Sequence, residues 1–132
     1  MEQHQKNAFA IAKWLQKQPR VQYVLYPGLE HHPGYEINKA QTTGFGGMIS
    51  FAVDNAETAR QILEGVKLIK FAESLGGTES LITYPIRQTH TDLTAEECAE
   101  KGITDCLLRF STGIEATQDL IEDLAQAFAA VK

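Results

Sequence analysis

Short apolar runs alternate with segments of helical periodicity along the whole chain, and this alternation indicates a fold in which helices cover a β-sheet. Residues 3–18 repeat apolar side chains at the i, i+3, i+4, i+7 spacing of one helix face, and Pro19 ends the repeat. Residues 117–131 carry a second apolar stripe of the same kind. Each of these helices therefore needs a surface to pack against on one side.

The segments between these two helices include runs with the length and composition of β-strands. MISFAV alternates strictly, with Ile49, Phe51 and Val53 on one face of the predicted strand. The predicted strands are residues 21–25, 48–53, 80–84 and 106–111, with residues 69–73 as a possible edge strand.

Capping residues locate further helices. Asp54 and Asn55 predict the start of a helix over residues 56–65. Thr94 and Glu97 have the spacing of a capping box and predict a short helix over 95–101, which Gly102 closes. One or two helical turns are expected around residues 34–42.

The resulting order, α-β-α-β-α-β-β-α-β-α, contains no repeat and no long linker. The short spacing between some strands favours a mixed or antiparallel sheet of about four strands with the helices on one face. We therefore predict a single α/β domain over residues 1–132, an α+β two-layer sandwich in which the first and last helices pack together.

Composition excludes several classes of function. The net charge is −5 and no cluster of lysine and arginine occurs, which argues against a nucleic-acid partner. No apolar run approaches the roughly 20 residues that span a membrane. The N-terminus is polar, and Cys98 and Cys106 do not suggest a disulfide framework, so a cytoplasmic location is expected.

Arg109 interrupts the apolar strand formed by residues 106–111. A guanidinium stays charged at ordinary pH, so burying it without a partner is costly. Two interpretations are open from the residues alone. Arg109 is either a structural residue paired with a carboxylate of its own domain, or a clamp that holds a ligand carboxylate or phosphate through two parallel hydrogen bonds.

Other polar residues form no recognisable catalytic or metal-binding set. The SLGG stretch is simplest as a tight turn, and the adjacent pair of histidines at 31 and 32 lies in a polar loop rich in proline and glycine. His90 has no cysteine or carboxylate at metal-ligand spacing, and Cys98 occupies a charged helix face. No metal site is predicted.

Five stretches of the chain carry a resemblance to a known family. VQYVLYPGL, GFGGMISF, FAESLGGTESLITYP, QTH and LLRFSTGIEATQDLIEDLAQAF stand in the family's order and spacing. The chain resembles the C-terminal domain of the pyridoxal-phosphate (PLP)-dependent enzymes of cysteine and methionine metabolism. The resemblance covers essentially all of the sequence. It implies the C-terminal small domain of the PLP-dependent transferase fold, which is the aspartate aminotransferase-like fold type I.

The resemblance also implies roles for four residues. Arg109 matches the arginine that binds the α-carboxylate of the amino-acid substrate, and Ser74 matches a serine beside the substrate. Glu73 matches a position that lines the substrate side-chain pocket, and Thr89 matches a threonine close to the arginine. If these roles hold, Arg109 should lack a salt bridge within the domain and project into a concavity shared with Ser74 and Thr89.

The family's cofactor site is missing from these residues. The SxTK-type motif with the Schiff-base lysine, the aspartate for the pyridine nitrogen and the stacking aromatic ring do not occur in the matching context. PLP is therefore expected in full-length members, whereas this chain, which lacks the N-terminal cofactor domain, is expected to bind none and to be inactive alone. No catalytic or cofactor-binding residue is assigned.

Within the family, the stretches ESLITYP, QTH and LLRFSTGIE most resemble those of cystathionine γ-synthases and O-acetylhomoserine thiol-lyases. The expected reaction is γ-replacement on an O-acyl-homoserine by cysteine or sulfide, in methionine and cysteine biosynthesis. A cystathionine β- or γ-lyase or methionine γ-lyase fragment is the alternative, as is a non-catalytic interaction module. Expected partners are an amino-acid substrate (O-acyl-homoserine, cysteine or cystathionine) and further copies in a homo-oligomer.

Overall fold

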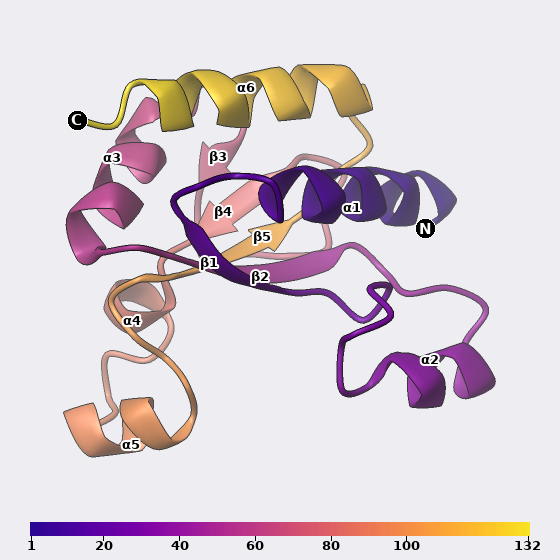
Figure 1. Ribbon diagram of the computed structural model, residues 1–132, viewed down its shortest axis with the longest axis horizontal. Coiled ribbons are helices and arrows are strands. Elements are labelled where there is room, and N and C mark those ends of the chain that lie inside the picture. Colours follow the sequence, from indigo (N-terminus) through magenta and orange to yellow (C-terminus); the bar gives the residue numbers. More distant parts are fainter.

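The computed structural model describes residues 1–132 as a sheet with its three long helices on one face (Figure 1). The strands are β1 (Val21–Leu25), β2 (Met48–Val53), β3 (Lys70–Phe71), β4 (Leu81–Thr83) and β5 (Leu107–Ser111). The helices are α1 (Glu2–Leu15), α2 (Tyr35–Gln41), α3 (Ala56–Gly65), α4 (Pro85–Gln88), α5 (Ala95–Glu100) and α6 (Thr117–Ala129).

The sheet is mixed, and β5 lies at its centre. The strand order is β1-β2-β5-β4-β3, with β3 and β4 parallel and the other neighbours antiparallel. In this register Arg109 lies between Ser50 of β2 and Thr83 of β4. Arg109, the residue whose charge suggests a ligand, therefore lies on the central strand of the sheet.

The hydrophobic core lies between the sheet and α1, α3 and α6. Alternate residues of the central strands face these helices, as the predicted alternation in MISFAV requires, and Phe51, Leu108 and Phe110 are fully buried there. The predicted contact between the first and last helices is confirmed. Trp14 of α1 packs edge-on against Phe128 of α6, with their ring centroids 5.6 Å apart.

A buried amide ties α1 to the turn that precedes α6. Asn7 is fully buried, and its Nδ2 donates to the carbonyl oxygens of Gly113 and Glu115 at 3.0 and 2.9 Å. Its Oδ1 accepts hydrogen bonds from Gln3 Nε2 and Thr117 Oγ1. Every hydrogen-bonding position of this buried side chain is satisfied, so the polar group is tolerated in the interior.

Both predicted helix caps are present. Asn55 Oδ1 accepts from the backbone N–H of Thr58 at the start of α3. At α5, Thr94 Oγ1 accepts from the N–H of Glu97, and the Glu97 carboxylate accepts from the N–H of Thr94. Each of these two caps joins residues only three positions apart, which explains why the sequence alone predicts them.

The structure differs from the prediction in the sheet and in the short helices. The sheet has five strands instead of about four, because residues 70–71 pair with β4 over a very short length. Helix α4 was not predicted; Pro85 stands in its first turn, where a missing N–H costs nothing. Only the long helices share one face, whereas α2, α4 and α5 lie beyond the opposite side of the sheet (Figure 1).

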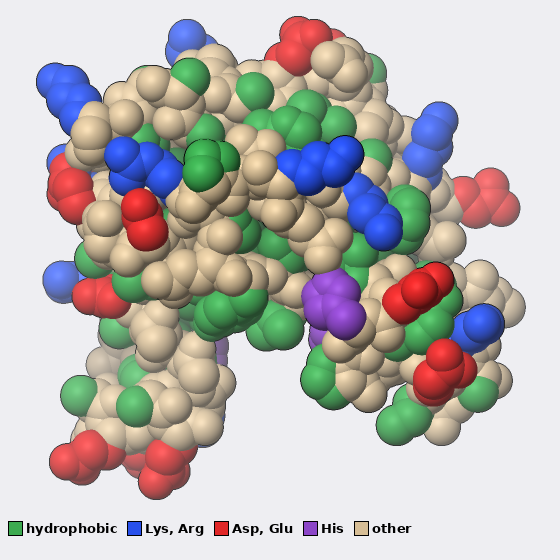
Figure 2. Space-filling model, in the orientation of Figure 1, with side chains coloured by type: hydrophobic (Ala, Val, Ile, Leu, Met, Phe, Trp, Pro, Cys, Tyr) green, Lys and Arg blue, Asp and Glu red, His purple; other side chains and the backbone are tan.

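This opposite side, which we call the open face, is hollowed between the lobe of α2 and the lobe of α4 and α5 (Figure 2). Tyr23 and Leu25 of β1 alternate with the buried Val24, so they lie on the open face, and they are 41% and 43% exposed. None of the helices has the length and apolar character needed to cross a membrane.

Candidate functional site on the open face of β5

The alternation of β5 places Arg109 on the open face. Leu108 and Phe110 on either side of it point into the core, so the Arg109 side chain leaves the strand in the opposite direction and is half-buried. The strand therefore tolerates an arginine inside an apolar run because the charge never enters the core.

The guanidinium of Arg109 makes hydrogen bonds to neutral groups only. Its Nη2 donates to the carbonyl oxygen of Glu73 at 2.7 Å and to Thr83 Oγ1 at 3.2 Å. The ion pairs of the chain involve two other arginines, Arg20 and Arg60. The interpretation of Arg109 as half of an internal salt bridge is therefore wrong, and the expectation that it lacks one is confirmed.

One donor of Arg109 is buried without an acceptor. The Nε atom has no hydrogen-bond partner, although the side chain's Nη2 is satisfied. A buried N–H without an acceptor raises the free energy of the folded chain, and an anion that accepts from it removes this cost. Because Nη2 holds two protein acceptors, the orientation of the guanidinium is fixed while its Nε stays without an acceptor.

The loop over Arg109 exists because β3 and β4 are parallel. Adjacent parallel strands cannot be joined by a tight hairpin, so residues 72–80 leave β3 and return to the start of β4. This segment, the 72–80 loop, contains the SLGG stretch, in which Gly76 has a left-handed φ of 74°. The loop brings the Glu73 carbonyl to Arg109 and leaves Ser74 exposed beside it.

Strand β5 and the turn after it anchor the 72–80 loop. Ser111 Oγ, on the same face of β5 as Arg109, accepts from the N–H of Gly76 at 2.8 Å. The carboxylate of Glu115 accepts from the backbone N–H and the hydroxyl of Ser80 at 2.7 and 2.8 Å. Arg109 and the loop are thus held by the same strand.

Thr89 belongs to a separate set of contacts. It ends α4, and its hydroxyl hydrogen bonds to the Pro85 carbonyl and to Nδ1 of His90, 2.7 Å away. No hollow of the domain is lined by Arg109 together with Ser74 and Thr89, so the shared concavity predicted for these three residues is not formed by this chain alone. The structure brings Glu73 and Arg109 into contact, places Ser74 next to them, and leaves Thr89 apart.

Sequence reasoning missed Thr83 and Ser111. Both hydroxyls contact the arginine or its loop, and both lie inside the stretches that carry the family resemblance, but no role was assigned to them. Ser111 could have been found from strand alternation, since it lies two residues after Arg109. Thr83 could not, because its place beside Arg109 depends on the pairing of β4 with β5.

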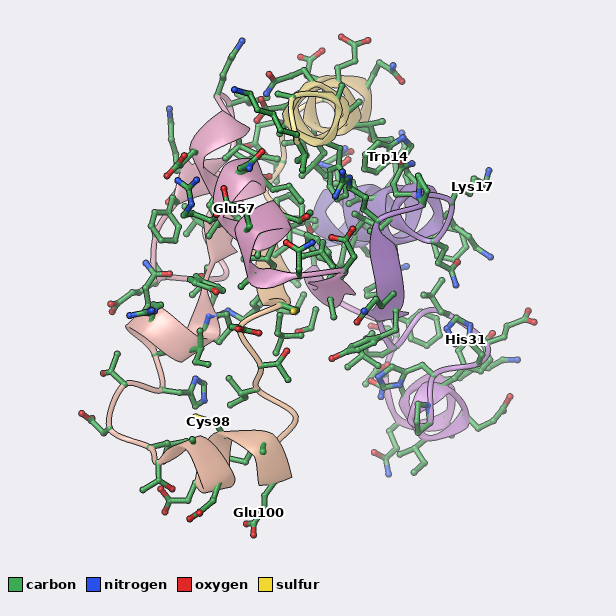
Figure 3. The ribbon with its side chains drawn as sticks, turned by 60° about the vertical axis from the view of Figure 1, so that its left-hand side comes forward. Trp14, Lys17, His31, Glu57, Cys98 and Glu100 are labelled. Carbon is green, nitrogen blue, oxygen red and sulfur yellow. The ribbon has the colours of Figure 1, made fainter.

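The remaining candidate residues form no second site. His31 lies exposed in the loop before α2, and Cys98 lies on the side of α5 that faces the body of the molecule, opposite Glu100 (Figure 3). The Cys98 thiol contacts the carbonyl oxygen of His90 at 4.0 Å. No cluster of three potential metal ligands occurs.

The sequence and fold of the domain match a known family. The chain belongs to the Cys/Met metabolism PLP-dependent enzymes, whose family model matches residues 1–129. It is 52% identical over 128 residues to cystathionine γ-lyase of Dictyostelium discoideum, covering 96% of this chain and 33% of that one. It is 49% identical over 132 residues to cystathionine γ-synthase of Haemophilus influenzae, covering 100% of this chain and 31% of that one.

Solved structures of the family have the same fold. Cystathionine γ-synthase from Xanthomonas oryzae pv. oryzae, in complex with aminoacrylate and cysteine, superposes with a TM-score of 0.93 at 44% identity. The match covers 98% of this chain and 34% of that one. The chain thus spans about a third of the length of the relatives that it matches. The expected fold, a small domain of fold type I, is confirmed.

The family's cofactor does not fit the residues of this domain. Pyridoxal phosphate is bound in such enzymes through a lysine amine, which needs a shielded position. Every lysine side chain of this chain is exposed, and none contacts Arg109. The residues of this domain therefore offer no shielded lysine to which the cofactor could be joined.

Proposed function

We propose that this chain is the substrate-recognising part of a PLP-dependent enzyme that acts on a sulfur-containing or γ-substituted amino acid, and that Arg109 binds the α-carboxylate. The observation that carries the proposal is the guanidinium of Arg109, which has a buried Nε without an acceptor and no carboxylate partner in the chain. The planar guanidinium of an arginine can bind a carboxylate through two parallel hydrogen bonds, which the ammonium of a lysine cannot do.

The neighbouring residues would then orient the substrate. Thr83 and the Glu73 carbonyl fix Nη2, so the fork cannot rotate away when a carboxylate arrives. Ser74 is exposed at the start of the glycine turn and would contact the substrate or cofactor, with the Glu73 side chain toward the substrate side-chain pocket. Thr89 would contribute from α4 once the rest of the enzyme closes the site. Fixing the carboxylate fixes the direction of the Cα–H bond.

For the reaction itself we propose γ-replacement on an O-acyl-homoserine by cysteine or sulfide, as in a cystathionine γ-synthase. The support is the resemblance in the 72–80 loop and in β5 and the similarity to the Haemophilus enzyme. Cleavage of cystathionine is the second candidate, and the 52% identity to the Dictyostelium γ-lyase favours it. Both reactions need the carboxylate to be held in the same way.

The carboxylate clamp can be tested on this chain directly. Adding L-homoserine should shift the Arg109 Nε–H resonance in ¹⁵N NMR spectra, with a dissociation constant in the millimolar range. L-Homoserine methyl ester, which lacks the carboxylate charge, should shift it much less. Followed through the backbone amide resonances of the 72–80 loop, Arg109→Lys should abolish saturable binding, whereas Arg87→Lys, at an exposed arginine on α4, should preserve it. Equal responses to acid and ester would refute the clamp.

The choice between reactions needs a longer protein. Residues 1–132 can replace the corresponding third of the Haemophilus cystathionine γ-synthase, and the chimera can be assayed for O-succinylhomoserine consumption with cysteine and for cystathionine cleavage. Faster replacement supports the synthase assignment. Faster cleavage assigns the lyase instead, and a folded, PLP-loaded chimera without either activity would favour a non-catalytic module.

A further inference from the structure

The N-terminal turn of α1 contacts the 72–80 loop through a histidine that no motif identifies. Nε2 of His4 lies 3.1 Å from the carbonyl oxygen of Gly77. Because a carbonyl oxygen can only accept, this nitrogen must carry a proton and donate it. Nδ1 of the same ring is buried and has no partner, so the contact with Gly77 is the side chain's only hydrogen bond.

The position of His4 is fixed by the end of β5. The hydroxyl of Thr112, the residue directly after β5, shares its one proton between the carbonyl oxygens of His4 and Gly47, each 2.9 Å away. The imidazole therefore stands on a backbone that is tied to the same strand that carries Arg109. Through its hydrogen bond to Gly77, His4 therefore links the 72–80 loop to the end of β5.

The 72–80 loop is consequently held on both sides of Ser74 and Leu75. Arg109 binds the carbonyl of Glu73 before them, and Ser111 binds the N–H of Gly76 after them. His4 adds its hydrogen bond at the next residue, Gly77. Ser74 and Leu75 are exposed between these anchors.

We propose that His4 is a positioning residue of the carboxylate site. By holding Gly77, it limits the movement of the loop and keeps the Glu73 carbonyl at Nη2 of Arg109, which in turn keeps the rest of the fork aimed at the ligand. The benefit to carboxylate binding rests on the proposed function of Arg109. The ordering of the loop does not, so the two can be tested separately.

The test measures amide hydrogen exchange and carboxylate affinity on the whole chain. In His4→Leu, exchange at the Gly76 N–H should quicken by about tenfold, the factor that corresponds to one ordinary hydrogen bond. Exchange at Phe110 in the core should stay unchanged. His4→Gln, whose amide nitrogen can take the place of Nε2, should restore slow exchange. His31→Leu, at an exposed histidine, is the matched control.

The affinity for L-homoserine should fall with loop order in His4→Leu and recover in His4→Gln. Unchanged exchange and affinity in His4→Leu would overturn the proposal while leaving the Arg109 clamp intact. Loss of loop order in a chain whose wild type binds no carboxylate would refute the clamp and retain the ordering role. If His4→Leu fails to fold, ¹⁵N spectra of the wild-type imidazole still decide, because a proton on Nδ1 instead of Nε2 excludes the contact.

Discussion

At the scale of single residues, the candidate site depends on polar groups that are held by neutral partners. Arg109 keeps its charge without a carboxylate because a carbonyl and a hydroxyl orient it. In another part of the domain a buried carboxylate, that of Asp123, is likewise held by neutral groups, here backbone donors. Asp123 is 7% exposed and accepts from three successive backbone N–H groups in the segment that joins α3 to β3.

Replacing Arg109 by lysine should separate binding from stability. An ammonium cannot reproduce two parallel hydrogen bonds, so in the chimera described above kcat/KM should fall by a factor equivalent to about 2–4 kcal/mol of transition-state stabilisation. The melting temperature of the chain should remain close to that of the wild type, because Arg109 forms no ion pair. A strongly lowered melting temperature with normal kinetics would assign a structural role instead.

Asp123→Asn should destabilise the domain. The carboxylate accepts from the N–H groups of residues 67, 68 and 69 at 2.8–2.9 Å. An amide offers one acceptor oxygen and brings a donor that faces other donors, so the free energy of unfolding should fall by about 2–3 kcal/mol. Urea unfolding measures the loss, with the exposed Asp92→Asn as the control. Equal stability of the two variants would contradict this expectation.

At the scale of elements, the sequence predicts those parts that local chemistry determines. The long helices follow from their apolar stripes, and the α3 and α5 starts follow from caps between near neighbours. Strand β3 lies within the edge strand predicted over residues 69–73, but its length of two residues is set by its pairing with β4, which the local pattern does not reveal. The same holds for the candidate site. Arg109 can be picked out from the sequence because it interrupts an apolar run, whereas the position of Thr83 beside it is known only from the pairing of β4 with β5.

The cap of α5 should make that helix sensitive to acid. Hydrogen bonds from the backbone N–H and hydroxyl of Thr94 lower the pKa of Glu97. A carboxyl whose folded pKa is depressed stabilises the folded state above its unfolded pKa, and this contribution disappears as pH falls through the depressed value. Amide exchange in α5 should therefore gain an extra acceleration below about pH 4 relative to α1. Glu97→Gln should remove that difference, and an unchanged profile would exclude the cap as its cause.

At the scale of the whole molecule, a fully buried tyrosine should make the stability of the fold depend on alkaline pH. Tyr26 is fully buried and donates to the Gly46 carbonyl, and burial raises its pKa to about 12. Between the ordinary tyrosine pKa of about 10 and this value, the unfolded chain loses a proton that the folded chain keeps. The free energy of unfolding should fall over this pH range, and the fall should be smaller in Tyr26→Phe. Parallel pH profiles for the two proteins would contradict the assignment.

The open face should also make the chain associate. On α1, Phe9 is 44% exposed, but Trp14 on the same helix is half-buried and packs edge-on against Phe128. Tyr23 and Leu25 on the open face are therefore the better candidates. We expect the scattering mass to rise with concentration and Leu25→Glu to reduce that rise. A monomer at high concentration would exclude association through this face.

The hydrogen bonds of Asn7 have a consequence for the order of events during synthesis. They join residues that are separated by 106 to 110 positions along the chain. A ribosome adds roughly 5–20 residues per second, so the apolar stripe of α1 emerges several seconds before the helix that covers it. During that interval the stripe is available to chaperones. The final turns of α6 thus set the moment at which the nascent chain can close the core between its first helix, its last helix and the sheet.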